Sequence, residues 1–183
     1  MEDHHKFIPI DEHAAYTSVE IGASTTEVKI ISPAGLIYAK SVSTGWDEMD
    51  TAIVEYMKRA HNLTIDGCTL KEIKMRAESA FAVGEEITII VCGRDSTGNL
   101  PKKVTIRSQE IHKPLSGLVH GIVDLLRNAM ERCPSDLLAD LKSRGIFLMG
   151  SQGGIKGFDQ ILSNATGLPV VITHKPVCTD NDV

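Results

Sequence analysis

The pattern of hydrophobic and polar positions divides the chain into strand-like and helix-like stretches. Three short runs between residues 16 and 42, YTSVEIG, TTEVKII and LIYAKSVS, carry apolar side chains at alternating positions. Pro33 and Gly35 separate the last two runs with turn-forming residues. The pattern predicts a three-stranded antiparallel meander. Over residues 45–62 apolar residues instead recur every three to four positions, which places them on one face of a helix; these residues are Ile53, Tyr56, Met57 and Ala60.

The middle of the chain predicts a helix followed by a hairpin. The stretch TLKEIKMRAESA (69–80) places Glu72 three residues after Thr69, the spacing of a capping box. Two strand-like runs follow, EEITIIVC (85–92) and KKVTIRS (102–108), with a long polar connection between them. Together these stretches predict an αββ unit.

The last third of the chain alternates helical patterns with buried-strand patterns. Helices are predicted over 108–132 and 133–145, and Pro114 is expected to kink or restart the first of them. The continuous apolar runs IFLMG (146–150) and LPVVIT (168–173) predict buried strands with a further helix between them.

The order of these elements, βββ-α-(αββ)-α-α-β-α-β, predicts the fold class. Three antiparallel strands followed by alternating helices and buried strands are typical of an α/β domain. We therefore expect a mixed five-stranded sheet with helices on its faces, and the αββ unit as an insertion outside that sheet.

Composition and charge exclude several classes of function. The 183 residues are 42% hydrophobic and 23% charged, with a net charge of -5, which is ordinary for a globular protein. Mixed charges without a basic patch, and only 4% aromatic residues, argue against a nucleic-acid partner. The chain shows neither a signal peptide nor an apolar run of the ~18 residues that a membrane span needs. The widely spaced cysteines favour reduced thiols over a disulfide framework, and so a cytoplasmic protein.

Three stretches could carry chemistry. In EIGASTTEVKII (20–31) a turn of small residues suits a backbone that closes around phosphate, although a plain hairpin is the alternative. In FLMGSQGGIKG (147–157) a glycine-rich turn before a helix could hold phosphate or adenosine, or could be only a tight connection. Lys71 and Lys74 could contact a ribose or phosphate, or could lie on a solvated helix face.

In their joint order these stretches resemble the bacterial actins of the MreB family. GWDEMDTAI (45–53) is close to that family's G-G-D-E-M-D-x-A-I, and GRDSTGNLPK (93–102) is close to its G-R-D-x-x-T-G-L-P-K. The resemblance runs from about Ile8 to Pro176. It implies an actin-like ATPase (ribonuclease H-like) fold, ATP and magnesium as cofactors, and cytoplasmic filaments that associate with the membrane. Such filaments regulate cell shape and guide cell-wall synthesis.

The resemblance covers the second half of that fold. The family's first phosphate loop, D-x-G-T, has no counterpart before Glu20, and the family continues beyond the last predicted strand. We therefore expect domain II of an actin-like protein after an N-terminal tail. The expected divisions are the tail at 1–14, domain II at 15–183, subdomain IIA at 15–60 and 109–183, and the inserted subdomain IIB at 61–108.

The resemblance also assigns nucleotide-binding positions residue by residue. The turn after the first strand corresponds to the family's second phosphate loop, D-I-G-G-G-T-T-E, with Glu20 in place of the aspartate that reaches a magnesium-bound water. Ala23 and Ser24 replace two glycines, which would cost about 1 kcal/mol each if the turn required the left-handed region. The assigned nucleotide-binding residues are Gly22, Ala23, Ser24, Thr25, Lys71, Glu72, Ile73, Lys74, Gly150, Ser151, Gln152 and Gly153.

The function that the resemblance implies is that of an MreB-like bacterial actin fragment. A single wall of a two-domain site predicts ATP affinity no better than ~1 mM. No catalytic residue is assigned: the resemblance implies an ATPase family, but without the first domain we expect this chain not to hydrolyse ATP. The expected partners are MreB-type filaments or further copies of the chain, since the two buried strands would leave an apolar area partly uncovered. The alternatives are a nucleotide-independent module that caps or modulates such filaments, and an inert truncated product.

Overall fold

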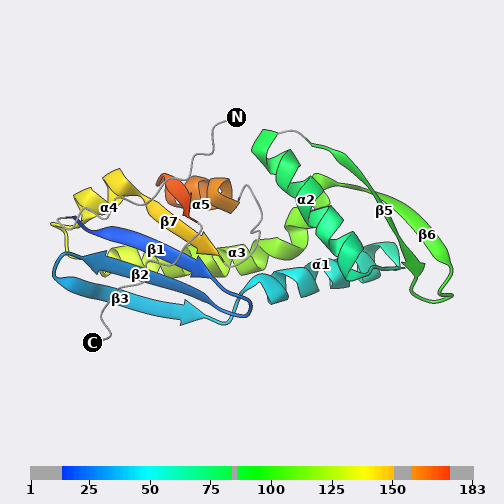
Figure 1. Ribbon diagram of the computed structural model, residues 1–183, viewed down its shortest axis with the longest axis horizontal. Coiled ribbons are helices and arrows are strands. Elements are labelled where there is room, and N and C mark those ends of the chain that lie inside the picture. The colour runs from blue at the N-terminus through cyan, green and yellow to red at the C-terminus, as the bar shows by residue number, and fades with distance from the viewer. Residues whose placement is uncertain (1–13, 84–85, 151–157, 174–183) are drawn as a thin grey trace.

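The main sheet has five strands in the order β3-β2-β1-β7-β8. In the computed structural model (Figure 1) the described residues are 14–83, 86–150 and 158–173. The first three strands are antiparallel, and β7 and β8 run parallel to β1. The predicted meander and mixed five-stranded sheet are therefore confirmed. The strands are β1 (Tyr16–Ile21), β2 (Thr26–Ser32), β3 (Gly35–Val42), β7 (Ile146–Gly150) and β8 (Val170–Thr173).

A second sheet lies outside the main one, in the order β4-β5-β6. Figure 1 shows the β5–β6 hairpin and the main sheet at opposite ends of an elongated molecule, with α1 between them. The hairpin was predicted, but β5 extends to Asp95, so the polar connection covers only residues 96–100. The pattern missed β4 altogether. The bounds are β4 (Leu63–Thr64), β5 (Thr88–Asp95) and β6 (Pro101–Arg107).

Strand alternation explains the core of the main sheet. Along β2, buried and partly exposed residues alternate, and Val28 and Ile30 are fully buried. Helix α3 (Ser108–Glu131) packs on β2 and β3, and α1 (Trp46–His61) packs on α3. The apolar face predicted for α1 supplies Ile53 and Met57 to this core.

One predicted helix restart is wrong, and one predicted helix is too long. Helix α3 continues through Pro114 without a restart, because burial of its long apolar face outweighs the ~3 kcal/mol that an interior proline costs. The alternative, a kink at Pro114, stays a prediction. Helix α4 (Leu138–Arg144) is shorter than predicted, because a turn in which Leu137 N–H donates to the Pro134 carbonyl precedes it. Helix α5 (Phe158–Thr166) contacts β8 and α3.

The cap of α2 (Gly67–Val83) also differs from the predicted one. The carboxylate of Asp66 accepts a hydrogen bond of 2.8 Å from the Thr69 backbone N–H, so Asp66 rather than Thr69 caps the helix. This hydrogen bond is the main cause that holds the pKa of Asp66 below its ordinary value. None of the helices in the described ranges is long and apolar enough to cross a bilayer.

Candidate functional site

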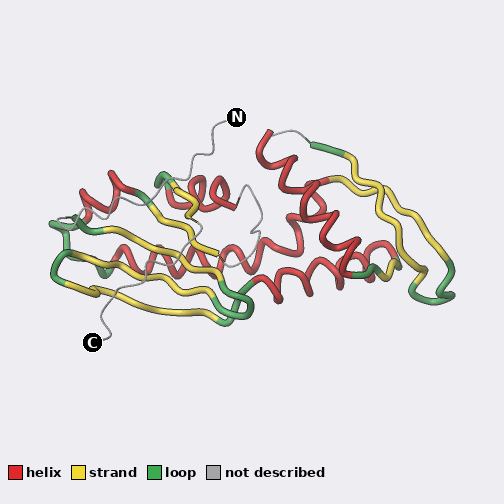
Figure 2. Tube along the Cα trace, viewed as in Figure 1, coloured by secondary structure: helices red, strands yellow, loops and turns green. Residues whose placement is uncertain are grey.

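The turn that follows β1 and the end of β7 lie at the same edge of the main sheet. Ile21, the last residue of β1, pairs in parallel with Gly150, the last residue of β7. Ligands of open α/β sheets bind outside the carboxyl ends of parallel strands, which makes this edge the candidate site. Figure 2 shows the loop between β1 and β2 beside the start of α1.

The first residues of α1 hold the turn by its carbonyl groups. The Trp46 N–H donates to the Gly22 carbonyl (3.1 Å), and the Asp47 N–H donates to the Ala23 carbonyl (2.8 Å). The turn is closed by a bond of 2.8 Å from the Gly22 N–H to the Thr25 carbonyl. Two N–H groups of the helix N-terminus are thus occupied by the turn itself.

This arrangement turns two other N–H groups outward. In a trans peptide unit the carbonyl of one residue and the N–H of the next point in opposite directions, and the described chain has no cis bond. Since the Gly22 and Ala23 carbonyls face α1, the N–H groups of Ala23 and Ser24 face away from it. Both residues are exposed, and these two N–H groups donate to no acceptor within the described residues. Adjacent outward N–H groups in line with a helix dipole suit an anion such as phosphate.

Close backbone contact at Gly45 makes this arrangement possible. A Cβ atom at position 45 would lie 2.3 Å from the Ala23 carbonyl oxygen and 2.6 Å from that of Gly22. Only glycine therefore lets the turn approach α1 so closely. The residue before Gly45 is also bound to the segment after the turn, since the Thr26 hydroxyl donates to the Thr44 carbonyl at 2.6 Å. Sequence reasoning missed this role of Gly45, although the residue stands in the stretch GWDEMDTAI.

The strain expected at Ala23 and Ser24 is absent. Neither residue has a positive φ; the described non-glycine residues that do are Asn62 and Asn99. Gly22 has no positive φ either. The turn does not need the left-handed region, so alanine and serine fit it without the expected cost of about 1 kcal/mol each.

Glu20 lies on the side of β1 opposite to its buried neighbours Val19 and Ile21. It is exposed and stands directly across from Glu27 on β2, whose carboxylate pairs with the Lys29 ammonium at 2.8 Å. No group of three or more potential metal-ligating side chains occurs in the described part of the chain. The water-mediated magnesium contact of Glu20 stays a prediction.

The four assigned residues of α2 have different surroundings. Ile73 is buried in the core, while Lys71 and Glu72 are exposed, and Glu72 pairs with Arg76 at 2.8 Å. The Lys74 ammonium contacts the Asp50 carboxylate at 2.6 Å. Because Asp50 lies one turn after Asp47 on α1, this ion pair ties α2 to the helix that holds the turn.

The assigned residues after β7 are only partly described. Gly150 ends β7 beside Ile21, and a Cβ atom there would lie 3.6 Å from the ring of Trp46. Ser151, Gln152 and Gly153 lie outside the described residues. The structure thus places the turn and Gly150 at one edge of the sheet, with α2 linked to that edge through Asp50.

The fold is that of an actin-like protein. Two crystal structures of MreB5 of Spiroplasma citri, bound to ADP and to AMPPNP, match with TM-scores of 0.79 and 0.78 at 27% identity. The first match covers 90% of this chain and 51% of that chain, and the second covers 88% and 49%. A MamK double helical filament shares the fold at 12% identity, with a TM-score of 0.66.

The chain belongs to the MreB/Mbl protein family, whose profile matches residues 7–180. It is 35% identical over 170 residues to the cell shape-determining protein MreB of Escherichia coli K12, covering 93% of this chain and 49% of that protein. It is 31% identical over 159 residues to the cell shape-determining protein Mbl of Bacillus subtilis 168, covering 87% and 48%. The chain spans about half the length of these curated relatives.

Proposed function

We propose that this chain forms one wall of the nucleotide site of an MreB-type bacterial actin, in which the turn after β1 binds phosphate. The observation that carries the proposal is the orientation of the turn, with the Gly22 and Ala23 carbonyls bound to α1 and the Ala23 and Ser24 N–H groups directed outward. The similar Spiroplasma citri structures are bound to ADP and AMPPNP, which supports a nucleotide as the ligand.

The other assigned residues surround this turn in the proposed site. Gly150, with Ser151, Gln152 and Gly153 after it, would contact the adenosine, and Lys71, Glu72 and Lys74 would approach it from α2. Ile73 would only support that segment, since its side chain is buried. Magnesium would be held through water at Glu20, because carboxylate oxygens suit this cation. The bound cation would also lower the repulsion between the Glu20 and Glu27 carboxylates, which lie opposite each other on β1 and β2.

The chain alone should bind ATP weakly, with a dissociation constant of ~1 mM or higher. A single wall supplies part of the contacts, while the entropic cost of association remains whole. Isothermal titration calorimetry with ATP and with tripolyphosphate tests this. Micromolar ATP binding would contradict the expected weakness, and no response to millimolar tripolyphosphate would contradict the phosphate site.

A charge introduced into the turn tests the location of the site. Ser24→Asp places a carboxylate beside the two outward N–H groups, and we expect it to abolish tripolyphosphate binding by charge repulsion. The residue is exposed, so the fold should be unaffected. Ser135→Asp, at an exposed position in the turn before α4, is the matched control and should bind like the wild type. Equal binding by both variants would show that the phosphate lies elsewhere.

In a filament the proposed partners are MreB-type subunits, including further copies of this chain. Such filaments would lie in the cytoplasm, associate with the membrane and act on cell shape. Co-sedimentation of the chain with full-length E. coli MreB, with and without ATP, tests this assignment. Nucleotide-dependent incorporation is expected, and absence from the pellet under both conditions would contradict it.

A nucleotide-independent module that caps or modulates filaments is the second candidate. The observation in its favour is the exposure of apolar side chains on the two edge strands of the main sheet, 60% for Leu36 on β3 and 41% for Ile172 on β8. The apolar area expected on β7 is absent, since Ile146, Phe147 and Leu148 are buried. Filaments shortened equally by the wild type and by Ser24→Asp would favour this candidate.

A further inference from the structure

The only tryptophan of the chain, Trp46, lies at the candidate site. It is the first residue of α1 and is 9% exposed. Its indole Nε1–H donates to the Ile21 carbonyl at 3.0 Å, and its backbone N–H donates to the Gly22 carbonyl at 3.1 Å. With the Asp47 N–H on the Ala23 carbonyl, two consecutive residues hold three consecutive carbonyl groups of the turn.

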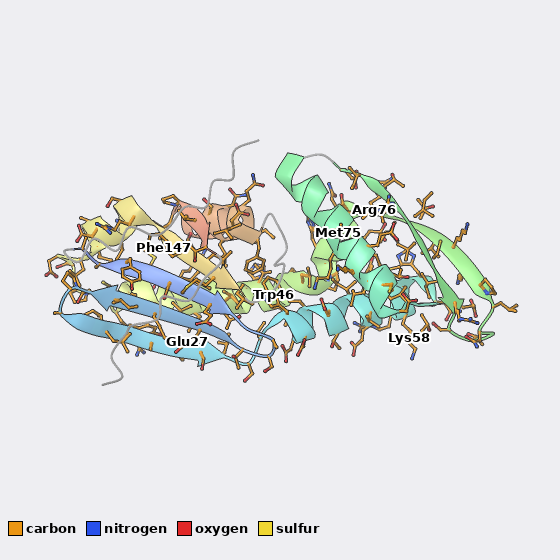
Figure 3. The ribbon with its side chains drawn as sticks, in the orientation of Figure 1. Glu27, Trp46, Lys58, Met75, Arg76 and Phe147 are labelled. Carbon is orange, nitrogen blue, oxygen red and sulfur yellow. The ribbon has the colours of Figure 1, made fainter. Side chains whose placement is uncertain are left out.

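The indole ring also contacts the other half of the site. It meets the Phe158 ring edge to face, with centroids 6.0 Å apart and planes at 68°. A Cβ atom added at Gly150 would lie 3.6 Å from the ring, so β7 ends beside the indole. Figure 3 shows Trp46 where α1 begins, at the edge of the main sheet. One side chain therefore joins the end of β1, the end of β7 and the start of α5.

We propose that Trp46 is the positioning residue of the phosphate-binding turn, an inference that rests on the proposed function. Its two N–H groups fix the peptide units of Ile21 and Gly22, and this fixes the direction of the Ala23 N–H. The turn is thus ordered on folding rather than on binding, which removes part of the entropic cost of binding an anion. The backbone N–H of Trp46 holds the Gly22–Ala23 peptide unit, and the part that only tryptophan supplies is the indole bond to the Ile21 carbonyl, which holds the adjacent Ile21–Gly22 unit.

A purely structural role makes a different prediction. A buried tryptophan with a satisfied N–H group also stabilises a core, and its loss would then lower global stability without a selective effect on the turn. Two variants separate the roles. Trp46→Phe keeps an aromatic ring but removes the Nε1–H donor, whereas Phe158→Leu removes packing on the same ring and leaves the donor in place.

Hydrogen exchange of backbone amides, measured by NMR on the full chain, reports directly on the stability of the turn. The Gly22 N–H bonds to the Thr25 carbonyl within the turn, so its exchange rate reports whether the turn is held. We expect Trp46→Phe to speed exchange at Gly22 about tenfold relative to the wild type, which corresponds to about 1.4 kcal/mol. In Phe158→Leu this exchange rate should stay within about threefold of the wild-type rate, after the rates of both variants are corrected for their change in global stability. Equal effects of the two variants would overturn the positioning role.

Binding of tripolyphosphate then connects the turn to its ligand. We expect Trp46→Phe to weaken this binding about fivefold to tenfold under conditions where it is fully folded, and Phe158→Leu to bind like the wild type. Unchanged affinity in Trp46→Phe would overturn the inference. If the wild type binds no tripolyphosphate while exchange at Gly22 still depends on Trp46, the proposed phosphate site is wrong, but Trp46 is still shown to fix the conformation of the turn. In the wild type, emission from this single tryptophan should shift on binding.

Discussion

The Lys102 ammonium lies 2.9 Å from the carbonyl oxygen of His61, the last residue of α1. It also contacts the Asn62 carbonyl at 3.3 Å and the Asp95 carboxylate at 3.2 Å. A cation at the C-terminus of a helix interacts favourably with the helix dipole and with carbonyl groups that have no partner in the helix. The stretch GRDSTGNLPK, which ends at Lys102, thus fastens the β5–β6 hairpin to the end of α1.

Replacing Lys102 should loosen this junction. We expect Lys102→Met to lower the free energy of unfolding by about 1 kcal/mol, since the side chain is 32% exposed and solvent screens part of its interaction. Urea denaturation followed by circular dichroism measures the change. Lys103→Met, at an exposed position on the same strand with no ion pair among the described residues, should have almost no effect. Equal losses in both variants would contradict the role given to Lys102.

A methyl group at Gly45 should displace the turn from α1. Its Cβ atom would lie 2.3 Å from the Ala23 carbonyl oxygen, and that oxygen belongs to backbone held by Asp47. We expect Gly45→Ala to destabilise the protein by about 1–3 kcal/mol, the range for an overpacked site, and to abolish tripolyphosphate binding. Thermal unfolding and calorimetry on the same sample measure both effects.

The matched control for Gly45 is a glycine with room for a side chain. Gly117 lies inside α3, and a Cβ atom there would have no neighbour within 4 Å. Alanine favours the helix over glycine, so Gly117→Ala should stabilise the protein by about 0.5–1 kcal/mol. If Gly45→Ala behaved like Gly117→Ala, the close approach of the turn to α1 would be wrong.

The sequence could predict those features that depend on neighbours along the chain. Alternation in β2 and the apolar face of α1 each reflect a local period, and both predicted elements are present. The cap of α2 was misplaced because Thr69 and Asp66 both offer a suitable side chain, and only the structure shows which one accepts the bond. Local patterns do not predict contacts between segments that are far apart in the sequence.

The candidate site shows why. Its turn was found from its small residues, but the outward direction of the Ala23 and Ser24 N–H groups depends on bonds from the Trp46 and Asp47 N–H groups to the Gly22 and Ala23 carbonyls, which belong to a distant segment of the chain. The close approach of Gly45 to Ala23 is likewise a contact between separate segments. No periodicity or short motif reports such contacts. Strain at Ala23 was wrongly expected because glycines in a similar motif were taken to require positive φ, whereas here close approach is what matters.

Acid should weaken the junction between α1 and α3 through Glu110. One of its carboxylate oxygens accepts the Arg107 backbone N–H at 2.9 Å, and the other lies 3.2 Å from the Tyr56 hydroxyl and 3.1 Å from His61 Nε2. The bond from Arg107 is the largest cause that lowers the pKa of Glu110 below its ordinary value of 4.5, with the Tyr56 and His61 bonds contributing further. A carboxyl group with a lowered folded-state pKa contributes stability above its unfolded-state pKa.

This contribution should be present above about pH 4.5 and be lost as the pH falls through the lower pKa of the folded state. We therefore expect Glu110→Gln to lower stability at pH 7 and to make the decline between pH 5 and pH 3 less steep, as measured by urea midpoints across this range. The control is Glu55→Gln, at a side chain that is 62% exposed on α1. A decline in Glu110→Gln as steep as in the wild type would show that Glu110 does not contribute.

Glycine at positions 23 and 24 should affect phosphate binding without relieving strain. Because neither residue has a positive φ, the double variant Ala23→Gly/Ser24→Gly gains nothing from the left-handed region. Removing two exposed Cβ atoms still allows phosphate to approach the Ala23 and Ser24 N–H groups more closely, while two glycines increase the disorder of the free turn. We expect tripolyphosphate affinity to rise by about twofold to fivefold, which corresponds to less than about 1 kcal/mol. Calorimetry on the wild type and the double variant measures it, and weaker binding by the variant would mean that phosphate does not lie on these two N–H groups.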